Sequence, residues 1–216
     1  AQLSEPYRKI SARINFSQDR IAVRGDIPMH PSQLLRNQLM SFFFFLLCRS
    51  INFGALGSII GHELSHAFDN QGRQFNAKGD LKNWWTKRAL AEFKNRTACL
   101  ANWFQKFSAA GNRENGQQTV GENIADGGGL RAAYTAYNIW EKEHGPEGNL
   151  PTVNLTSQQL FFTAFAQVRP FCQPITFHSP ARFRVLGTLS NSPEFSQHFH
   201  CPLDSPMNPS RKCTLW

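Results

Sequence analysis

The chain has 216 residues, of which 41% are hydrophobic, and this composition argues against a disordered protein and allows one sizeable core. The formal net charge of +8 comes from scattered basic residues without a nucleic-acid-binding signature, so we expect no nucleic-acid partner. The one strongly apolar run, Leu39–Cys48, has about half of the roughly 20 residues that a membrane-spanning helix needs. We expect it to form a buried strand or a core helix.

Residues 1–50 differ from the rest of the chain, and we treat them as a divergent N-terminal segment. Residues 1–36 are polar, mixed and without clear periodicity, and the apolar run follows abruptly. From residue 51 onward the pattern is consistently helical. The sequence therefore predicts a second part, residues 51–216, that is mainly α with little strand.

The first expected helix covers Asn52–Asp69, ends before the stop signal Gly72, and contains His62-Glu63-Leu64-Ser65-His66. Two histidines four residues apart on a helix differ by about 40° in direction and roughly 6 Å in height, so both imidazoles can reach one ion. Glu63 is turned about 100° from His62 and can reach a water on that ion. This is the zinc-peptidase arrangement of two ligands and a general base, and a hydrogen-bonded polar face without metal is the alternative.

Apolar residues repeat at a spacing of four along this first helix and form an apolar stripe. The two histidines lie together, away from that stripe. The stripe consists of Leu56, Ile60, Leu64 and Phe68.

Further helices are expected along the rest of the chain. An amphipathic helix is expected between Trp85 and Phe107, a third helix over Glu122–Lys142, and a fourth over Leu160–Val168 behind the capping box Thr156–Gln159. The pair Ser192-Pro193 predicts the start of a short helix that reaches Phe199. The loop 111–118 is polar, and Phe183–Leu189 is the best candidate for a strand.

A third metal ligand is available at the start of the third helix. A catalytic zinc takes three protein ligands and keeps one position open for water. Glu122 can supply the third ligand, and Asp126, one turn later, can accept the second ring N–H of a ligating histidine. The alternative is an acidic first turn that faces solvent, because acidic residues are common there.

Cysteines and glycosylation sequons bear on the compartment of the protein. The five cysteines form no C-x-x-C pair, and their odd number leaves at least one thiol without a partner, which allows disulfide-linked association between chains. Sequons at Asn15, Asn95 and Asn154 favour a secreted glycoprotein.

Short motifs recur from about Asn52 to the C-terminus, and their order is informative. They are Asn52-Phe53-Gly54, Gly61–Asp69, Gly72-Arg73, Trp84-Trp85, Gly121–Asp126 with Gly128-Gly129-Leu130, Gln159–Phe162, Arg184-Val185, Met207-Asn208-Pro209 and Lys212–Trp216. In this order they resemble the C-terminal catalytic part of the neprilysin and endothelin-converting-enzyme family of zinc metalloendopeptidases.

The resemblance implies a mainly α, thermolysin-like (gluzincin) catalytic domain fragment that binds one Zn²⁺ per chain and cleaves peptide substrates. It also implies an extracellular or cell-surface location, in the ectodomain of a type II membrane protein whose membrane anchor belongs to an N-terminal part missing here. The implied roles are zinc ligands for His62, His66 and Glu122, general base for Glu63, support of a ligand for Asp126, oxyanion stabilisation for His178, and binding of the substrate backbone or carboxylate for Arg184.

The sequence departs from the family in three places. The Asn-Ala segment that binds substrate backbone is absent, although Met29–Gln33 and Arg36–Met40 resemble its surroundings; the stretch from Cys172 to His178 is short; and the N-terminal lobe is missing. A positioning error of about 1 Å can cost around a hundredfold in rate. A catalytically silent, zinc-binding fragment that acts as an interaction or decoy protein therefore remains the alternative function.

The resemblance also pairs Cys99, on the long helix, with Cys213, near the C-terminus. The family partners of Cys172 and Cys201 lie in the missing N-terminal part, and Cys48 has no family counterpart. We therefore expect Cys172 and Cys201 to be free or mispaired.

Overall fold

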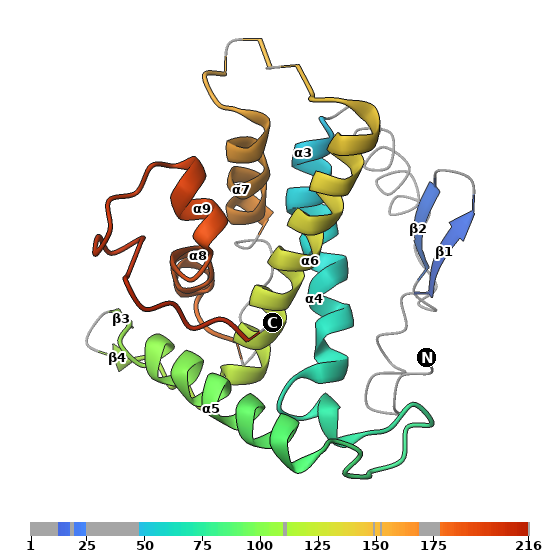
Figure 1. The fold of residues 1–216 in the computed structure, drawn as a ribbon, viewed down its shortest axis with the longest axis vertical. Coiled ribbons are helices and arrows are strands. Elements are labelled where there is room, and N and C mark those ends of the chain that lie inside the picture. Colours follow the sequence, from blue (N-terminus) through green and yellow to red (C-terminus); the bar gives the residue numbers. More distant parts are fainter. Residues whose placement is uncertain are drawn as a thin grey trace. The chain divides into compact units, whose positions relative to one another are not determined.

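The computed structural model describes residues 13–17, 20–24, 48–109, 112–148, 150–151, 153–168 and 178–215 (Figure 1). The chain divides into two compact units, residues 1–47 with 74–84, and residues 48–73 with 85–216. Most of the segment 1–50 and of the apolar run lies outside the described residues, so the predictions for these stretches stay predictions. Within the described ranges, none of the helices combines the length and apolar composition that a bilayer crossing requires.

The first unit contains two short antiparallel features in its described part. Strands β1 (Arg13–Ser17) and β2 (Arg20–Arg24) form a hairpin in which Arg13 lies opposite Arg24. Residues 74–84 form a turn closed by a bridge between Phe75 and Leu81. The Asn76 side chain accepts hydrogen bonds from the backbone N–H groups of Lys78 and Asp80, which is the local reason for the turn.

The second unit is built of helices, as the periodicity predicted. A continuous helical segment consists of α3 (Arg49–Asn52), the π-helical turn η1 (Phe53–Gly57), α4 (Ser58–Ser65) and the 3₁₀ turn η2 (His66–Phe68). The 3₁₀ turn η3 (Gly72–Gln74) follows. The remaining elements are α5 (Lys87–Phe104), the strand pair β3 (Ser108–Ala109) and β4 (Asn112–Arg113), α6 (Val120–His144), α7 (Ser157–Val168), α8 (Ala181–Ser190) and α9 (Pro193–His198).

Two helix starts that the sequence predicted are confirmed in atomic detail. The backbone N–H of Gln159 donates to Thr156 Oγ1 over 3.2 Å, and the backbone N–H of Thr156 donates to Gln159 Oε1 over 3.0 Å, which is a capping box. At α9 the backbone N–H of Phe195 donates to Ser192 Oγ over 3.1 Å, and Pro193 occupies the first turn.

The strand prediction for Phe183–Leu189 is wrong, because these residues form helix α8. Their buried positions follow a helical period of three to four residues and include Phe183, Arg184, Gly187 and Thr188. Two of these residues hide the pattern, since an arginine and a glycine rarely mark a core face. A Cβ at Gly187 would lie 2.4 Å from the ring of Phe104, so only glycine admits this contact between α8 and α5.

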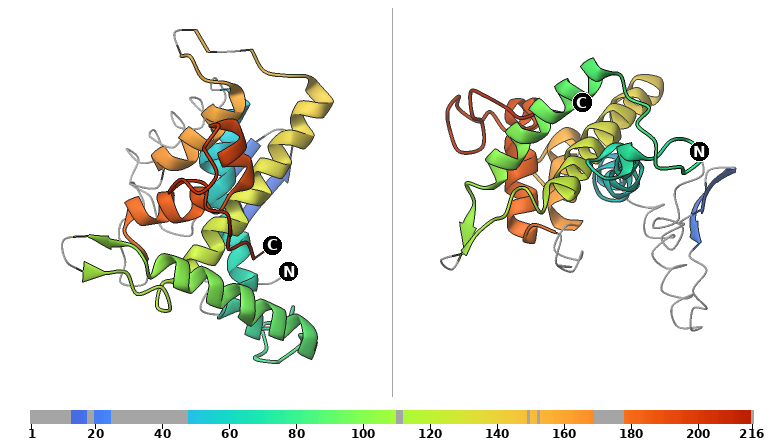
Figure 2. Two further views of the ribbon diagram at one scale, coloured as in Figure 1. Left: turned by 60° about the vertical axis from the view of Figure 1, so that its left-hand side comes forward. Right: turned by 90° about the horizontal axis from the view of Figure 1, so that it is seen from below.

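Helices α4 and α6 run alongside each other (Figures 1 and 2). Their contact is made by glycines: a Cβ on Gly61 would lie 2.8 Å from Gly129 Cα, and a Cβ on Gly129 would lie 2.5 Å from His62 N. The predicted apolar stripe is therefore not the packing face. Its members Leu64 and Phe68 are 60% and 46% exposed, whereas small residues and His62 are buried against α6.

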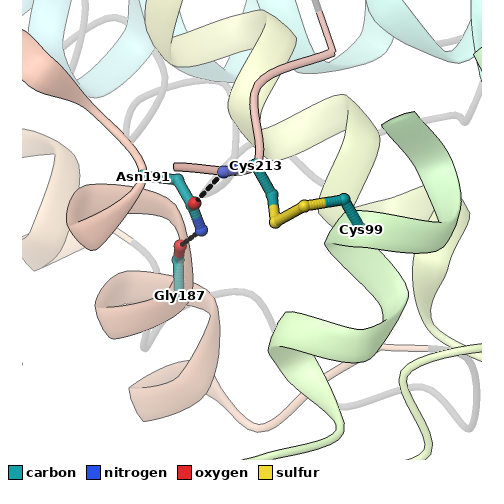
Figure 3. Close-up of a disulfide and its surroundings, with 4 residues drawn as sticks. All are labelled: Cys99, Gly187, Asn191 and Cys213. Carbon is teal, nitrogen blue, oxygen red and sulfur yellow. Dashed lines mark hydrogen bonds between the residues drawn. A yellow bond between two sulfur atoms is a disulfide. The ribbon is translucent and has the colours of Figure 1, made fainter. Parts of the chain in front are cut away.

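The predicted pairing of Cys99 with Cys213 is confirmed, with 5.5 Å between their Cα atoms (Figure 3). The disulfide joins α5 to the C-terminal tail, and the tail is also held where the N–H of Cys213 donates to Asn191 Oδ1 over 2.6 Å. In the chain-entropy model, a loop of about this size gains roughly 4.7 kcal/mol of stability from its disulfide. Cys201 is free, as expected, Cys48 is free as well, and Cys172 lies outside the described residues.

Candidate metal centre

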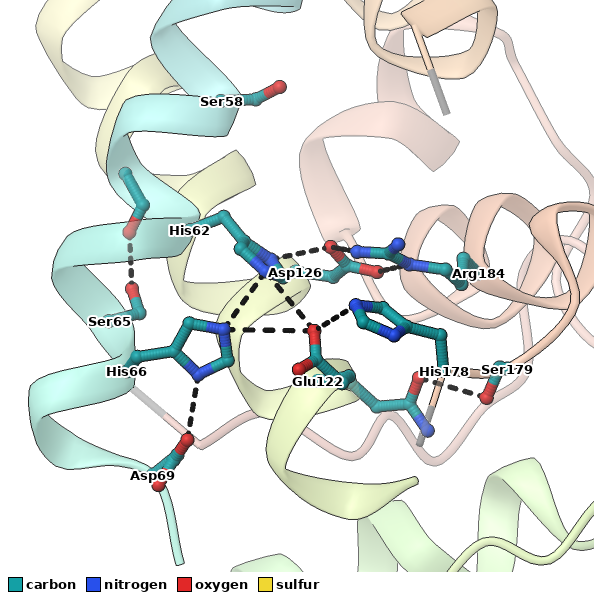
Figure 4. Close-up of polar contacts among 12 residues, drawn as sticks. Ser58, His62, Ser65, His66, Asp69, Glu122, Asp126, His178, Ser179 and Arg184 are labelled. Atoms are coloured by element: carbon teal, nitrogen blue, oxygen red, sulfur yellow. Dashed lines mark hydrogen bonds and ion pairs between the residues drawn. The ribbon is translucent and has the colours of Figure 1, made fainter. Parts of the chain in front are cut away.

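The three predicted ligands meet where the helical segment 49–68 passes the first turn of α6. One ligand atom from each of His62, His66 and Glu122 lies within 4.8 Å of the others (Figure 4). The two Nε2 atoms are 3.1 Å apart, and Oε2 of Glu122 lies 3.2 Å from Nε2 of His62 and 3.7 Å from Nε2 of His66. The Gly61–Gly129 contact makes this approach possible, because it brings α4 against α6 one residue before His62.

A buried carboxylate supports each histidine from behind. Nδ1 of His62 lies 2.8 Å from Asp126 Oδ1, and Nδ1 of His66 lies 2.7 Å from Asp69 Oδ2 (Figure 4). Both aspartates are almost fully buried. A carboxylate at Nδ1 accepts a hydrogen bond, so each Nδ1 carries the ring proton and each Nε2 presents a lone pair.

Asp69 was missed by the sequence reasoning, although a local signal was present. It lies three residues after His66, where the helical segment ends, and this spacing places its carboxylate beside the imidazole. Its second oxygen accepts the backbone N–H groups of Gln71 and Gly72, each over 2.7 Å. The turn that ends the helix thus also fixes the carboxylate that orients His66.

The donor set fits a zinc ion. With both Nδ1 atoms protonated, two imidazole lone pairs and a carboxylate oxygen converge without a proton between them. Oε2 of Glu122 is buried, and within the described part of the chain no group donates to it in acceptable hydrogen-bond geometry. These three acceptor atoms repel one another unless a cation lies between them. Two imidazoles with one carboxylate are a typical ligand set of a catalytic zinc.

The electrostatics keep Glu122 in the form that binds metal. Burial by itself would raise the pKa of the Glu122 carboxyl, but the neighbouring imidazoles of His62, His66 and His178 outweigh burial and hold this pKa below its ordinary value. The carboxyl is therefore ionised at neutral pH. An ionised carboxylate is the form that ligates a divalent cation.

The remaining predicted site residues surround this cluster with different exposures. Glu63 follows His62 on α4, and its side chain is exposed. His178 precedes α8, and its Nε2 atom lies 3.0 Å from Glu122 Oε2, on the other side of that carboxylate from His66 (Figure 4). The roles predicted for Glu63 and His178 stay predictions.

Arg184 is deeply buried, and its guanidinium holds Asp126 in a two-point contact. Its Nε donates to Asp126 Oδ2 over 2.7 Å, and its second terminal nitrogen donates to Asp126 Oδ1 over 2.8 Å. Only 3% of Arg184 is exposed. The arginine therefore orients the carboxylate that orients His62, and a direct contact with substrate stays a prediction.

The comparisons with known proteins agree on one family. The model of peptidase family M13 matches residues 34–215, beginning before the stretch that carries the sequence motifs. Endothelin-converting enzyme 1 of Bos taurus is 50% identical over 178 residues, which are 77% of this chain and 23% of the relative. The human endothelin-converting enzyme-like 1 is 45% identical over 177 residues, 78% of this chain and 23% of the relative.

A solved structure shows the same fold. The zinc metalloprotease ZMP1 of Mycobacterium tuberculosis, in complex with an inhibitor, superposes with a TM-score of 0.70 at 30% identity over 78% of this chain and 28% of that chain. The chain thus spans about a quarter of the length of the relatives that it matches. With the family model covering most of its residues, the chain belongs to peptidase family M13, the neprilysin and endothelin-converting-enzyme family.

Proposed function

We propose that this chain carries the zinc centre of an endopeptidase and that the centre hydrolyses peptide bonds. The observation that carries the proposal is the convergence of His62, His66 and Glu122, with each Nδ1 held by a buried aspartate. The names of its relatives, which include endothelin-converting enzymes and a zinc metalloprotease, support the same reaction class. The catalytically silent alternative has no comparable support.

The residues of the chain divide the chemistry among them. His62, His66 and Glu122 would hold a Zn²⁺ ion, which would supply Lewis-acid chemistry for a carbonyl and a water molecule. Glu63, exposed beside His62, takes the proton from the attacking water and passes it to the leaving amine. An N–H at Nε2 of His178, beside Glu122, donates to the oxygen that becomes negative in the transition state.

Peptide hydrolysis by the purified chain should depend on one bound metal ion. We expect a fluorogenic peptide to be cleaved, cleavage to stop with a chelator and to return with added zinc, and metal analysis to give about one zinc per chain. His62→Ala should lose both zinc and activity, because two ligands do not hold the ion.

His144→Ala is the matched control, since His144 is an exposed histidine at the end of α6 whose Nδ1 lies 2.9 Å from the Trp140 carbonyl and whose ring stacks on Trp140. It should keep both properties. Unchanged zinc content in His62→Ala would contradict the metal centre. Zinc binding without cleavage in the parent chain would instead favour the silent fragment.

We further propose that the protein works outside the cell or at its surface. The Cys99–Cys213 disulfide supports this, because such bonds persist in oxidising compartments. The sequon residues Asn95 and Asn154 are exposed, so both can carry glycans.

Protein secreted from eukaryotic cells should therefore lose mass on treatment with an N-glycosidase. Asn95→Gln with Asn154→Gln should remove most of that change, whereas Asn115→Gln, an exposed asparagine outside any sequon, should not. A secreted protein whose mass the enzyme leaves unchanged would refute glycosylation.

A further inference from the structure

A buried polar cluster that the proposed mechanism does not use lies next to the metal centre. The Ser179 hydroxyl donates to Glu114 Oε1 over 2.8 Å and shares the same proton with Asn123 Oδ1, a second acceptor at 3.2 Å. Ser179 and Asn123 are each 1% exposed, and Glu114 is 8% exposed. A carboxylate this deeply buried is costly unless its partners are in place, so the cluster calls for an explanation.

The cluster joins three segments that are distant in the sequence. Glu114 follows the strand pair β3–β4, and its backbone N–H donates to the Phe107 carbonyl over 2.9 Å. Asn123 directly follows the ligand Glu122 on α6, and its amide donates to Thr119 Oγ1 over 3.1 Å. Ser179 directly follows His178, and Figure 4 shows the two side by side. The Ser179 hydroxyl therefore links the segment that carries His178 to the turn of α6 that carries the ligand Glu122.

Among the described residues, the His178 ring lacks the carboxylate at Nδ1 that His62 and His66 each have. Within the described part of the chain, Nδ1 of His178 is buried and has no hydrogen-bond partner. The other ring nitrogen, Nε2, faces Glu122 at 3.0 Å, which is the reacting side. His62 and His66, in contrast, are each fixed from behind by an aspartate. Among the described residues, the position of the His178 ring therefore depends on the Glu122 contact and on its backbone, which the Ser179 side chain anchors.

We propose that Glu114 and Ser179 are positioning residues that set the place of His178 over the metal centre. Glu114 accepts the hydrogen bond of the Ser179 hydroxyl, and Ser179 anchors the backbone that carries His178. The contact with Asn123 joins this arrangement to α6. This inference rests on the proposed peptidase function. It assigns to Glu114, a buried carboxylate outside the set of ligand atoms, a part in transition-state stabilisation that acts through His178.

Steady-state kinetics on the zinc-loaded full chain test this assignment. Ser179→Ala and Glu114→Gln should each lower kcat about ten- to a hundredfold, with little change in KM and in zinc content. The reason is that the hydrogen bond from His178 to the oxyanion forms in the transition state, so a displaced ring weakens that state and not substrate binding. Ser179→Thr keeps a hydroxyl and should restore most of the rate. Ser196→Ala removes another buried hydroxyl, bonded to the Ser192 and Met207 carbonyls, and should leave kcat unchanged.

A double-mutant cycle separates positioning from general damage. In a His178→Ala background, Ser179→Ala should cause no further loss of kcat, because the group that it positions is gone. Equal losses of kcat in both backgrounds would overturn the proposal. Should Ser179→Ala not fold, the same cycle with Glu114→Gln decides the question.

A second measurement does not require activity. The chain has seven histidines, and the ring signals of His178 can be assigned in NMR spectra of histidine-labelled protein by their loss in His178→Ala. Ser179→Ala should shift or broaden these signals, whereas Ser196→Ala should not. An unchanged His178 signal would refute the positioning role. An inactive parent chain with a shifted His178 signal would refute only the peptidase function.

Discussion

Glu63→Gln is expected to lower peptide hydrolysis by about two to four orders of magnitude while leaving the zinc content unchanged. The amide has the size of the carboxylate but cannot take a proton from water. Glu63 lies beside the ligand His62, and it is exposed toward solvent, outside the group of three ligand atoms. The substitution therefore removes the general base without removing a ligand. Initial rates and zinc per chain, measured on the same preparation, check both halves of this expectation.

Glu143→Gln is the matched control, because Glu143 is an exposed glutamate near the end of the long helix α6. It should behave like the parent chain in both measurements. Full activity in Glu63→Gln would reject Glu63 as the base. Loss of zinc together with activity would show that Glu63 helps to hold the metal.

Asp126→Ala should produce the largest loss of stability of any single change near the site. Asp126 is fully buried and is contacted by Arg184 at both oxygens and by Nδ1 of His62. Its removal leaves the buried guanidinium of Arg184 without its carboxylate, a change that typically costs about 3–5 kcal/mol. Zinc affinity should also fall about ten- to a hundredfold, because His62 loses the partner that orients its ring. Denaturant unfolding and competition with a chelator measure the two effects.

The double variant Asp126→Ala with Arg184→Met separates these two effects. It removes both members of the buried pair, so most of the lost free energy of unfolding should return. Zinc affinity should stay low, because His62 still lacks its acceptor. A double variant no more stable than Asp126→Ala alone would show that the Arg184 charge is not the source of the instability.

Several features whose partners lie within four residues were predicted from the sequence, although the support of His66 by Asp69 was not. The capping box at Thr156, the start of α9 at Ser192 and the spacing of His62 and His66 depend only on local helix geometry, so composition and spacing were sufficient. The pairing of Cys99 with Cys213 spans 114 residues. It was predicted only through resemblance to a family, since chain physics does not rank the pairings of five cysteines.

Other features were decided by the tertiary structure alone, because their physical cause lies in another element. Helix α8 can bury Arg184 because Asp126 on α6 neutralises the guanidinium. It tolerates Gly187 because the ring of Phe104 on α5 fills the space that a side chain would take. The face of α4 that packs against α6 consists of small residues, because Gly129 of α6 comes close to Gly61. Leu64 lies off this face and is exposed. Hydropathy patterning assigns apolar residues to the core and charged residues to the surface. Such patterning does not predict a core that contains the Arg184–Asp126 ion pair and the contact between Gly61 and Gly129, because burial of these groups is favourable only once the partner helix is in place.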